Sequence, residues 1–300
     1  MNIAVVGSGF VGQATGNGLQ KHGNNITFVD VDETKITNLL AEGFEAVLAD
    51  RYARITTEIT MFCVPTPTRG GAINLDYLIA AIEAFAHRLK NHDQYHVAVI
   101  RSTVPPGTTR TKVLPIIERI SGKTAGEDFG LIMQPEYLRE ITAKQDFARP
   151  WFILIGELDP KAGAVIHKLY RNFDAPIQHC TLEEAEFQKY VHNVYNAVKI
   201  AFFNEMRLIA KNENWDADKV FRATAESGEA MWNPIYGIRD FGPFDGSCLP
   251  KDTRALLEWA EEKNYELGIL RAVITENFRH EELLGKNQTV RINYLENISV

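Results

Sequence analysis

Cysteine is scarce in this sequence, with three residues among 300, at positions 63, 180 and 248. Cysteines so few and so far apart cannot build the disulfide framework of a small secreted protein, so we expect a reducing, cytoplasmic location. The eight histidines show no HExxH or HxxEH spacing, and no CxxC pair occurs. Because zinc sites depend on such clusters, the sequence predicts no metal centre.

Long hydrophobic runs and an excess of positive charge are also lacking. No apolar stretch approaches the ~20 residues of a membrane span. The run from Ile3 to Val6 stops at Gly7 and has no basic residues before it, which does not fit a signal peptide. A net charge of −7 argues against a nucleic-acid binder with a generally basic surface. We therefore expect a two-domain enzyme with neither a membrane nor a nucleic acid as partner.

Short β-branched runs alternate with helical patterns in the first part of the chain, which indicates a parallel sheet covered by helices. Several of these runs are continuously apolar, as strands buried on both faces should be. The sequence thus predicts an α/β domain with a doubly wound parallel sheet over residues 1–180. The predicted strands are Asn2–Val6, Asn25–Val29, Ile59–Val64, His96–Ile100, Gly130–Gln134, Trp151–Ile155 and Pro176–His179.

The second part, residues 181–300, has helical periodicity and predicts an all-helical domain. Its longest helix should open at the capping box from Thr181 to Glu184 and run to about Lys211. At 1.5 Å per residue this helix would span ~45 Å, long enough for residues 181–211 to form the spine of a homodimer. Further helices are predicted at Ala217–Ser227, with Asp216 as N-cap, at Thr253–Lys263 and at Ile269–Leu284, and residues 228–250 are predicted to form an ordered loop.

A glycine-rich turn, Gly7-Ser-Gly9-Phe-Val-Gly12, joins the first predicted strand to a helical pattern. This GxGxxG motif is weak alone, but Asp30 at the end of the second strand is in register with it. Gly7 permits the turn, Gly9 lets a pyrophosphate approach the helix N-terminus, and Gly12 lets the helix pack closely. Asp30 would bind the adenosine ribose and repel a 2′-phosphate. The pattern predicts a Rossmann domain that binds NAD; FAD, or a turn without a ligand, are the alternatives.

Two further predicted strands end in proline-containing loops. One leads into Pro65-Thr66-Pro67, and the other leads into Ser102-Thr103 and on to Gly107. Ligands of open α/β sheets bind at the carboxyl ends of the strands, and proline holds a loop rigid. We expect both loops to face the cofactor, although each could be an ordinary turn.

The string from Gly246 to Asp252 is the most informative part of the second half. Cys248 lies in a glycine-bearing loop just before a predicted helix, where a thiol can become reactive. A lone cysteine is more often a small buried hydrophobe, which is how we interpret Cys63 and Cys180. Asp252 could serve in catalysis, and it could also cap the helix predicted from Thr253.

Two pairs of polar residues could act on a substrate near the cofactor. Lys189 and Asn193 are four residues apart and share one face of the long helix, so they could hold and polarise a substrate oxygen. Glu136 and Glu140 follow the strand Gly130–Gln134, where a carboxylate could act as general base on water. A solvated helix face and surface acids are the alternatives.

Together these residues resemble the UDP-glucose/GDP-mannose dehydrogenase family. The resemblance implies NAD-dependent oxidation of the primary alcohol of a nucleotide sugar, UDP-glucose above all, to the carboxylate in two hydride transfers. A four-electron oxidation needs a covalent handle for the aldehyde, and Cys248 can supply it. The matches run in order along the chain: GSGFVG at 7–12, Asp30, VPTPT at 64–68, STVPPGT at 102–108, PEYLRE at 135–140, KYVHN at 189–193, FFNE at 202–205 and GSCLPKDT at 246–253.

The resemblance also implies residue roles. Cys248 would form a thiohemiacetal and then a thioester, Lys189 and Asn193 would stabilise oxyanion character, and Asp252 with Lys189 would assist proton transfers. Glu136 would activate the hydrolytic water, with Thr103 helping to place it. NAD would contact Gly7, Gly9, Phe10, Val11, Gly12, Asp30, Lys35, Val64, Pro65, Thr66, Ser102 and Thr103. The nucleotide sugar would contact Tyr137, Leu138, Glu140, Lys189, Asn193, Tyr236, Arg239 and Gly246.

Two features depart from the pattern of this family. Its members usually carry G-[FY]-G-G before the cysteine, whereas Pro243 and Asp245 stand here, which leaves the hexose open. We also expect a short form without the family's C-terminal nucleotide-binding domain. Either the nucleotide is held by fewer contacts, or a separate partner chain supplies the missing domain, or the substrate is different.

Two other functions compete with this interpretation. A β-hydroxyacid dehydrogenase pairs the same two kinds of domain and uses a Lys-x-x-x-Asn pair, but it makes one NADH per turnover and needs no Cys248. The glycine-rich turn before its lysine is replaced here by residues 184–188. A non-catalytic NAD-binding module is the third possibility, and the intact cysteine, lysine and acidic positions speak against it.

Overall fold

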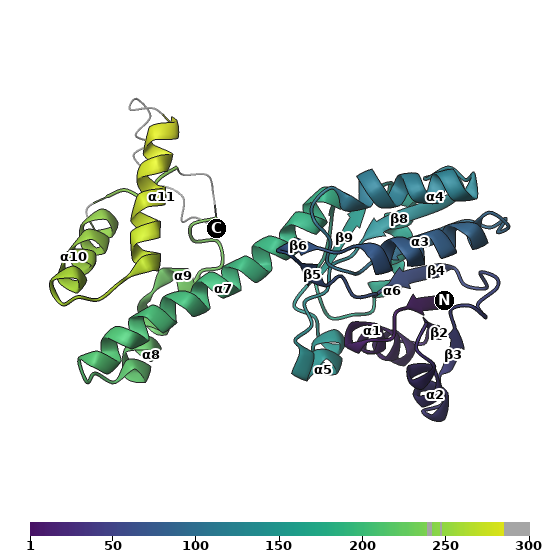
Figure 1. Ribbon diagram of the computed structural model, residues 1–300, viewed down its shortest axis with the longest axis horizontal. Helices are drawn as coiled ribbons and strands as arrows, with labels where there is room; N and C mark the ends of the chain where they lie inside the picture. The colour runs from purple at the N-terminus through teal and green to yellow at the C-terminus, as the bar shows by residue number, and fades with distance from the viewer. Residues whose placement is uncertain (239–241, 247, 285–300) are drawn as a thin grey trace. The chain divides into compact units, whose positions relative to one another are not determined.

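The computed structural model describes residues 1–238, 242–246 and 248–284 (Figure 1). By contacts the chain divides into two compact units, Met1–Asn193 and Val194–Val300. This division falls within the helix α7 (Leu182–Asn212). The domain boundary that the sequence predicts at 180/181 stays a prediction.

An eight-stranded sheet forms the centre of the first unit, in the order β10-β9-β8-β7-β4-β1-β2-β3. The strands β1, β2, β3, β4, β7 and β8 pair in parallel, whereas β9 runs antiparallel to β8. The predicted doubly wound sheet is thus confirmed, with a reversed pair, β9 and β10, at one edge. The strands are β1 Asn2–Val6, β2 Asn25–Asp30, β3 Glu45–Leu48, β4 Ile59–Phe62, β7 His96–Ile100, β8 Phe129–Met133, β9 Ile153–Glu157 and β10 Ile177–Thr181, and β5 Thr68–Arg69 pairs with β6 Ala72–Ile73 in a separate hairpin.

Helices cover both faces of this sheet, because its strands are apolar on both sides. Within β7, Val97 and Val99 belong to a core shared with α1, α5 and α6, whereas Ala98 and Ile100 pack with α3 and α4. Figure 1 shows α3 and α4 along one face and α1 and α5 along the other. The helices of this unit are α1 Phe10–Lys21, α2 Glu33–Ala41, α3 Asp76–Leu89, a π-helix at Thr109–Val113, α4 Leu114–Ser121, a 3-10 turn at Glu140–Thr142, α5 Ala143–Ala148 and α6 Pro160–Tyr170.

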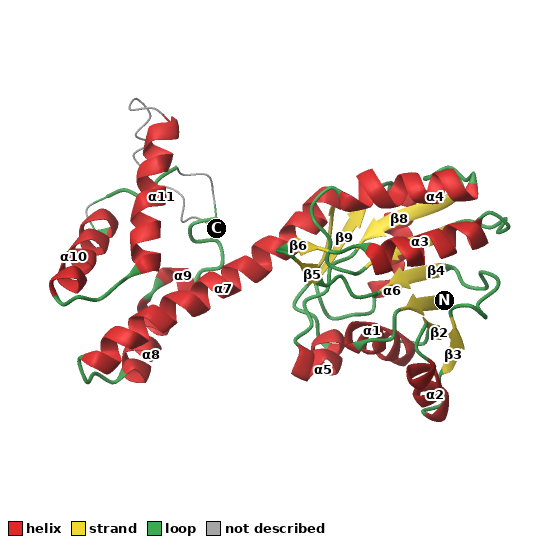
Figure 2. Ribbon diagram, in the orientation of Figure 1, coloured by secondary structure: helices red, strands yellow, loops and turns green. Residues whose placement is uncertain are grey.

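The second unit consists of helices and loops in its described residues (Figure 2). The capping box at the start of α7, which lies in the first unit, is confirmed: Thr181 N donates to Glu184 Oε2 at 2.8 Å, and Glu184 N donates to Thr181 Oγ1 at 3.3 Å. Asp216 caps the next helix by accepting from Lys219 N at 3.0 Å. After α7 come α8 Ala217–Ser227, α9 Glu229–Trp232, α10 Leu249–Glu262 and α11 Gly268–Leu284.

Two sequence predictions fail in this unit. Residues 228–250 do not form one loop, because the short helix α9 lies within them and α10 already begins at Leu249. Pro250 stands in the first turn of α10. The N–H groups of that turn have no partner within the helix, so the N–H that proline lacks costs no hydrogen bond there. The N-cap is therefore Cys248, and Asp252 lies inside the helix and does not cap it. No described helix is long and apolar enough to cross a membrane.

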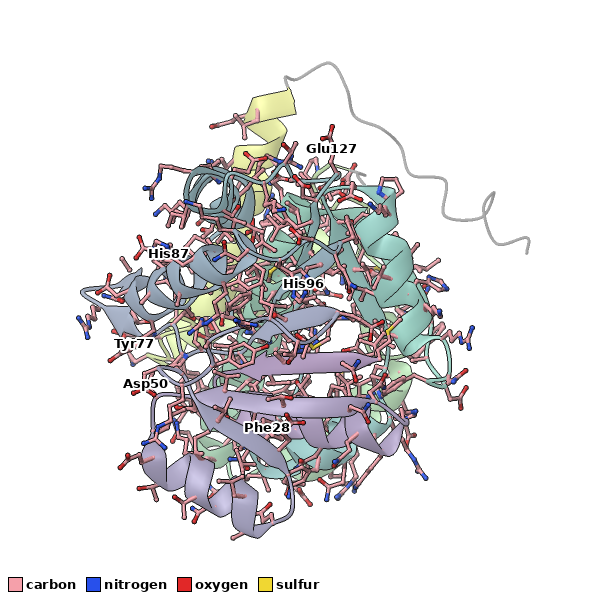
Figure 3. All side chains as sticks on the ribbon, turned by 90° about the vertical axis from the view of Figure 1, so that its right-hand side faces the viewer. Phe28, Asp50, Tyr77, His87, His96 and Glu127 are labelled. Carbon is pink, nitrogen blue, oxygen red and sulfur yellow. The ribbon has the colours of Figure 1, made fainter. Side chains whose placement is uncertain are left out.

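His96, fully buried in β7, predicts a pH-dependent loss of stability (Figure 3). Its Nδ1 donates to the Thr57 carbonyl at 3.0 Å, since a carbonyl can only accept, and in the neutral ring Nε2 accepts from Thr60 Oγ1 at 2.9 Å. Burial lowers the pKa of His96 to about 3. Between pH 6.5 and 3 the histidine is therefore protonated in the unfolded chain and neutral in the folded chain. The free energy of unfolding decreases as the pH is lowered through this range, by up to ~1.4 kcal/mol per pH unit.

The measurement is urea unfolding of the wild type and His96→Asn at pH 7, 6, 5 and 4. Asparagine can still donate to the Thr57 carbonyl, but it does not titrate. We expect the wild type to lose ~2 kcal/mol more than the variant between pH 6 and pH 4. Equal pH dependences would contradict the assignment of this effect to His96.

Candidate active site

The glycine-rich turn between β1 and α1 has the geometry that a dinucleotide requires. Gly7 has a left-handed φ of +93°, and a Cβ there would lie 2.8 Å from the Cys63 backbone. A Cβ on Gly12 would lie 1.9 Å from the Gly7 oxygen, so α1 packs directly on the turn. A Cβ on Gly9 would meet no atom within 4 Å, which leaves open space above the helix N-terminus.

Asp30 at the end of β2 is fixed beside this turn. It is buried, and its Oδ2 accepts from Ser8 N at 2.5 Å while Oδ1 accepts from Asp32 N at 3.0 Å. Lys35 Nζ, from the half-exposed side chain of α2, lies 3.7 Å from Asp30 Oδ2. The backbone thus holds the carboxylate in one orientation, suitable for accepting ribose hydroxyls.

A cavity of about 810 Å³ lies along the carboxyl edge of the parallel strands, over this turn. Its volume falls in the range of small-molecule and cofactor sites, and the open face of Gly9 adjoins it. Gly12 lies below the turn and does not line it. Among the predicted NAD contacts, the lining residues are Gly7, Gly9, Phe10, Val11, Asp30, Lys35, Val64, Pro65, Thr66, Ser102 and Thr103. These residues fit NAD.

Sequence reasoning missed one wall of this cavity. Tyr52 follows β3, and its main-chain oxygen accepts from Arg88 Nε of α3. Arg88 Nη2 also donates to the Ala49 oxygen at 2.7 Å. Further lining comes from α3 through Tyr77, Ala80, Ala81, Ala84 and Phe85. The signal that could have found this wall is the group of small alanines on α3, whose short side chains leave space beside the helix.

Asp30→Asn predicts a change of cofactor preference. The substitution removes the charge that would repel a 2′-phosphate. It also leaves one side-chain oxygen to accept from the backbone N–H groups of Ser8 and Asp32. We expect the ratio of NAD to NADP affinity to fall at least about tenfold, or ~1.4 kcal/mol. Titration of both cofactors by calorimetry measures it. Asp50→Asn is the control, because this exposed acid (Figure 3) does not line the cavity; an equal shift in both variants would contradict a specific role.

The two proline-containing loops are tied to each other at the cavity. Thr66 Oγ1 donates to the Thr103 carbonyl at 2.7 Å. Ser102 Oγ donates to the Val64 carbonyl at 2.6 Å. Because both loops follow neighbouring parallel strands, β4 and β7, their hydrogen bonds make one rigid edge of the site.

Lys189 and Glu136 form a buried pair next to this edge. Lys189 Nζ donates to the Glu136 main-chain oxygen and lies 3.2 Å from Glu136 Oε1, and both side chains are largely buried. Glu136 also lines the cavity, and its Oε2 accepts from Leu138 N at 2.6 Å. A cation and a carboxylate held this way can exchange a proton with a bound substrate.

The segment after Glu136 is anchored by several contacts. The Tyr137 ring stacks on Phe152 with centroids 5.0 Å apart, and its hydroxyl donates to Gln188 Oε1 of α7. Arg139 N donates to the buried Asp146 at 2.9 Å, which fixes the chain beyond Leu138. The side chain of Glu140, in the 3-10 turn, lies outside the described residues.

The other predicted catalytic and substrate residues lie in α7 and the second unit. Asn193 is exposed on α7. Cys248 is exposed at the N-cap of α10, and Asp252 in the first turn pairs with Lys251 at 2.6 Å. Gly246 has a left-handed φ of +89°, Tyr236 is half-buried in a turn, and Arg239 lies outside the described residues.

The three cysteines differ in accessibility. Cys63 lies buried beside the cofactor cavity, and burial raises its pKa to about 11. Partial burial likewise raises the pKa of Cys180 to about 11. Both thiols are thus protonated at neutral pH, as expected for structural cysteines, whereas Cys248 is exposed.

An anchor that the sequence did not reveal holds the segment before Cys248. Phe244 N donates to Asn277 Oδ1 at 2.6 Å, and Asn277 Nδ2 donates back to the Phe244 oxygen at 3.0 Å. The side chain of α11 thus fixes the backbone between Pro243 and Asp245, where the sequence departs from the family pattern.

Comparison with known proteins identifies two matching regions. Residues 1–174 match the UDP-glucose/GDP-mannose dehydrogenase family, NAD binding domain, and residues 183–279 match the central domain of that family. GDP-mannose 6-dehydrogenase from Pseudomonas putida is 36% identical over 298 residues, 92% of this chain and 68% of that protein. UDP-glucose 6-dehydrogenase from Haloferax volcanii is 31% identical over 304 residues, 92% of this chain and 69% of that protein.

Solved structures show the same fold. A ternary complex of GDP-mannose dehydrogenase from Pseudomonas aeruginosa has a TM-score of 0.87 and 33% identity, over 93% of this chain and 69% of that one. A UDP-glucose dehydrogenase from Pyrobaculum islandicum has a TM-score of 0.70 and 31% identity, over 93% and 68% of the two chains. The predicted Rossmann sheet followed by a helical region with a long helix is confirmed.

Proposed function

Because the chain belongs to the UDP-glucose/GDP-mannose dehydrogenase family, with its NAD binding and central domains, we propose that it oxidises a nucleotide-linked hexose to the uronic acid. One observation carries the proposal beyond the family match. The buried pair Lys189–Glu136 stands at the edge of the NAD cavity, where a hydroxyl that gives up a hydride has to lose its proton.

The proposed chemistry follows from the residue types. NAD held in the cavity that Gly9, Asp30 and Thr66 line would supply the hydride acceptor for both oxidations. Lys189 and Asn193 stabilise the negative charge that develops on the substrate oxygen. Lys189 and Asp252 assist the transfer of the proton from that oxygen. The Cys248 sulfur adds to the aldehyde carbon while a proton passes to the aldehyde oxygen, so a C–S bond forms, the C=O π bond breaks and a thiohemiacetal results. Transfer of the hydride from this carbon to the cofactor, with loss of the hydroxyl proton, then gives the thioester.

Hydrolysis then ends the proposed cycle. A water positioned with the help of Thr103 gives a proton to Glu136 and attacks the thioester carbon, the C–S bond breaks, and the carboxylate leaves with the thiol restored. The hydrogen bond from Leu138 N to Glu136 Oε2 keeps that carboxylate oriented for this role.

GDP-mannose is the substrate we propose first, ahead of the UDP-glucose expected from sequence. Relatives named as GDP-mannose 6-dehydrogenases reach 36% identity, and a structure so named has a TM-score of 0.87. The relatives named for UDP-glucose reach 31%, with a TM-score of 0.70 in the structure cited above. These differences favour the first substrate, and Pro243 and Asp245 are where the hexose preference should be sought.

The test is a stoichiometric assay with GDP-mannose, UDP-glucose and a β-hydroxyacid in parallel. We expect two NADH per sugar acid with one nucleotide sugar, and the higher kcat/KM with GDP-mannose. UDP-glucose as the better substrate would overturn the sugar assignment only. One NADH per product with the hydroxyacid would favour the rival enzyme class, and tight NAD binding without turnover would favour a non-catalytic module.

We also propose a homodimer that pairs through residues 181–211. Several large apolar side chains on α7 are exposed, namely Val191, Val194, Tyr195, Val198 and Phe202. An exposed apolar stripe on a long helix is typical of an interface. Light scattering coupled to gel filtration tests it, and a monomer at micromolar concentration would contradict it.

A further inference from the structure

Glu186, on α7, is a buried carboxylate with no role in the proposed chemistry. It is 1% exposed and lies one helical turn before Lys189. Its Oε1 accepts from Thr109 N at 2.7 Å, and its Oε2 accepts from Gly107 N. Both donors are main-chain groups at the end of the loop that carries Ser102 and Thr103.

No basic side chain within the described residues makes an ion pair with Glu186. Burial raises the pKa of this carboxyl, and hydrogen bonding from Thr109 and Gly107 acts in the opposite direction. Arg110 interacts with Glu186 electrostatically but forms its ion pair with Glu183. A buried carboxylate outside any ion pair is costly, so its hydrogen bonds to the loop are the contacts that retain it.

The loop needs such an anchor because of its backbone. Gly107 has a left-handed φ of +86°, and the π-helix Thr109–Val113 begins two residues later. Upstream, the Thr103 carbonyl accepts from Thr66 at the cofactor cavity. The loop is therefore fixed at one end to the cofactor edge and at the other to Glu186.

The same stretch of α7 also anchors the loop after β8, which carries Glu136 and Tyr137. Lys189 donates to the Glu136 main chain, and Gln188 accepts from Tyr137. Within four residues, one helix thus fixes the loop after β7 and the loop after β8. A displacement of the first loop would change where Thr103 lies relative to Glu136.

We propose that Glu186 is a positioning residue, which holds loop 102–109 on α7 so that Thr103 stays in place for the reaction. It acts through the loop backbone and touches neither substrate nor cofactor. This role rests on the function proposed above for Thr103 and Glu136. NAD affinity should depend on it less than kcat does: Ser102 and Thr103 of the loop line the cavity, but Gly9 and Asp30, which would hold the adenosine diphosphate half, are not contacted by Glu186.

The test compares Glu186→Gln with Glu183→Gln in the full chain. Glu183 is a matched control, since it also joins α7 to the π-helix, but through a half-exposed ion pair with Arg110. A glutamine at 186 keeps the size but offers one acceptor oxygen for two N–H groups. We expect kcat to fall ~10- to 100-fold with the KM for NAD within about threefold, and the control to stay within about twofold of the wild type.

Amide hydrogen exchange gives a readout that does not need turnover. The Gly107 and Thr109 amides should exchange at least about tenfold faster in Glu186→Gln, and at the wild-type rate in Glu183→Gln. Faster exchange in Glu186→Gln than in the wild type, together with a wild type that oxidises no nucleotide sugar, would mean that the anchor is real and the proposed function wrong.

A purely structural role would give another pattern. The fraction of NAD-competent protein would then fall, with kcat per NAD site unchanged. If Glu186→Gln does not fold, Glu186→Asp replaces it, because aspartate keeps the charge but withdraws the carboxylate by one methylene. Wild-type kcat per NAD site and wild-type exchange in the folded variant would overturn the proposal.

Discussion

Cys248→Ala is expected to abolish formation of the sugar acid, with kcat reduced by at least about 10³-fold. Without the thiol the aldehyde has no covalent handle, so the second oxidation has no thiohemiacetal to start from. The measurement is NADH formed per sugar acid, with the nucleotide sugar that the wild type prefers. Some NADH from the first oxidation can still appear, but the ratio of two NADH per acid should be lost.

Cys180→Ser is the matched control for this variant. Its thiol is half-buried and its pKa is raised to about 11, so it should not act as a nucleophile at neutral pH, and activity should stay within about twofold of the wild type. Limited alkylation with iodoacetamide adds a direct check, since exposed Cys248 should react before buried Cys63. A fully active Cys248→Ala enzyme would rule out the thioester route and favour the single-hydride class.

The sheet and the cofactor turn could be predicted because their signals are local. Buried parallel strands such as His96–Ile100 are apolar on both faces, and the glycine spacing from Gly7 to Gly12 fits one strand–turn–helix geometry. The strand β3 escaped prediction because Glu45–Leu48 is short and mostly half-buried, so its apolar pattern is weak. Missing it also hid Tyr52, which lines the cavity just beyond it.

Helix starts were predicted well where a side chain caps them, as at Thr181 and Asp216, and poorly at α10. Cys248 makes no side-chain cap bond, so the sequence offered only Pro250 as a start signal. Placing the start at Thr253 made Asp252 a cap, although it lies in the first turn. Glu186 could not be recognised at all, because its partners are main-chain groups 77 and 79 residues away in sequence.

Gly9→Ala and Gly12→Ala are expected to separate cofactor binding from folding. Gly9 has a φ of −73°, which alanine adopts freely, and its Cβ would meet no atom within 4 Å. We expect its free energy of unfolding to stay within ~0.5 kcal/mol of the wild type. The new methyl group would stand in the cavity at the N-terminus of α1, however, where the pyrophosphate approaches the backbone. NAD affinity should therefore fall ~10²-fold, about 2.7 kcal/mol.

Gly12→Ala should show the opposite order of effects. Its Cβ would lie 1.9 Å from the Gly7 oxygen, so α1 must move away from the turn, at a cost of ~1–3 kcal/mol in the free energy of unfolding. Loss of NAD binding would then follow from the displaced turn. Urea unfolding and NAD calorimetry on both variants measure the two quantities. Wild-type NAD affinity in Gly9→Ala would show that the pyrophosphate does not lie over this glycine, whatever Gly12→Ala does to stability.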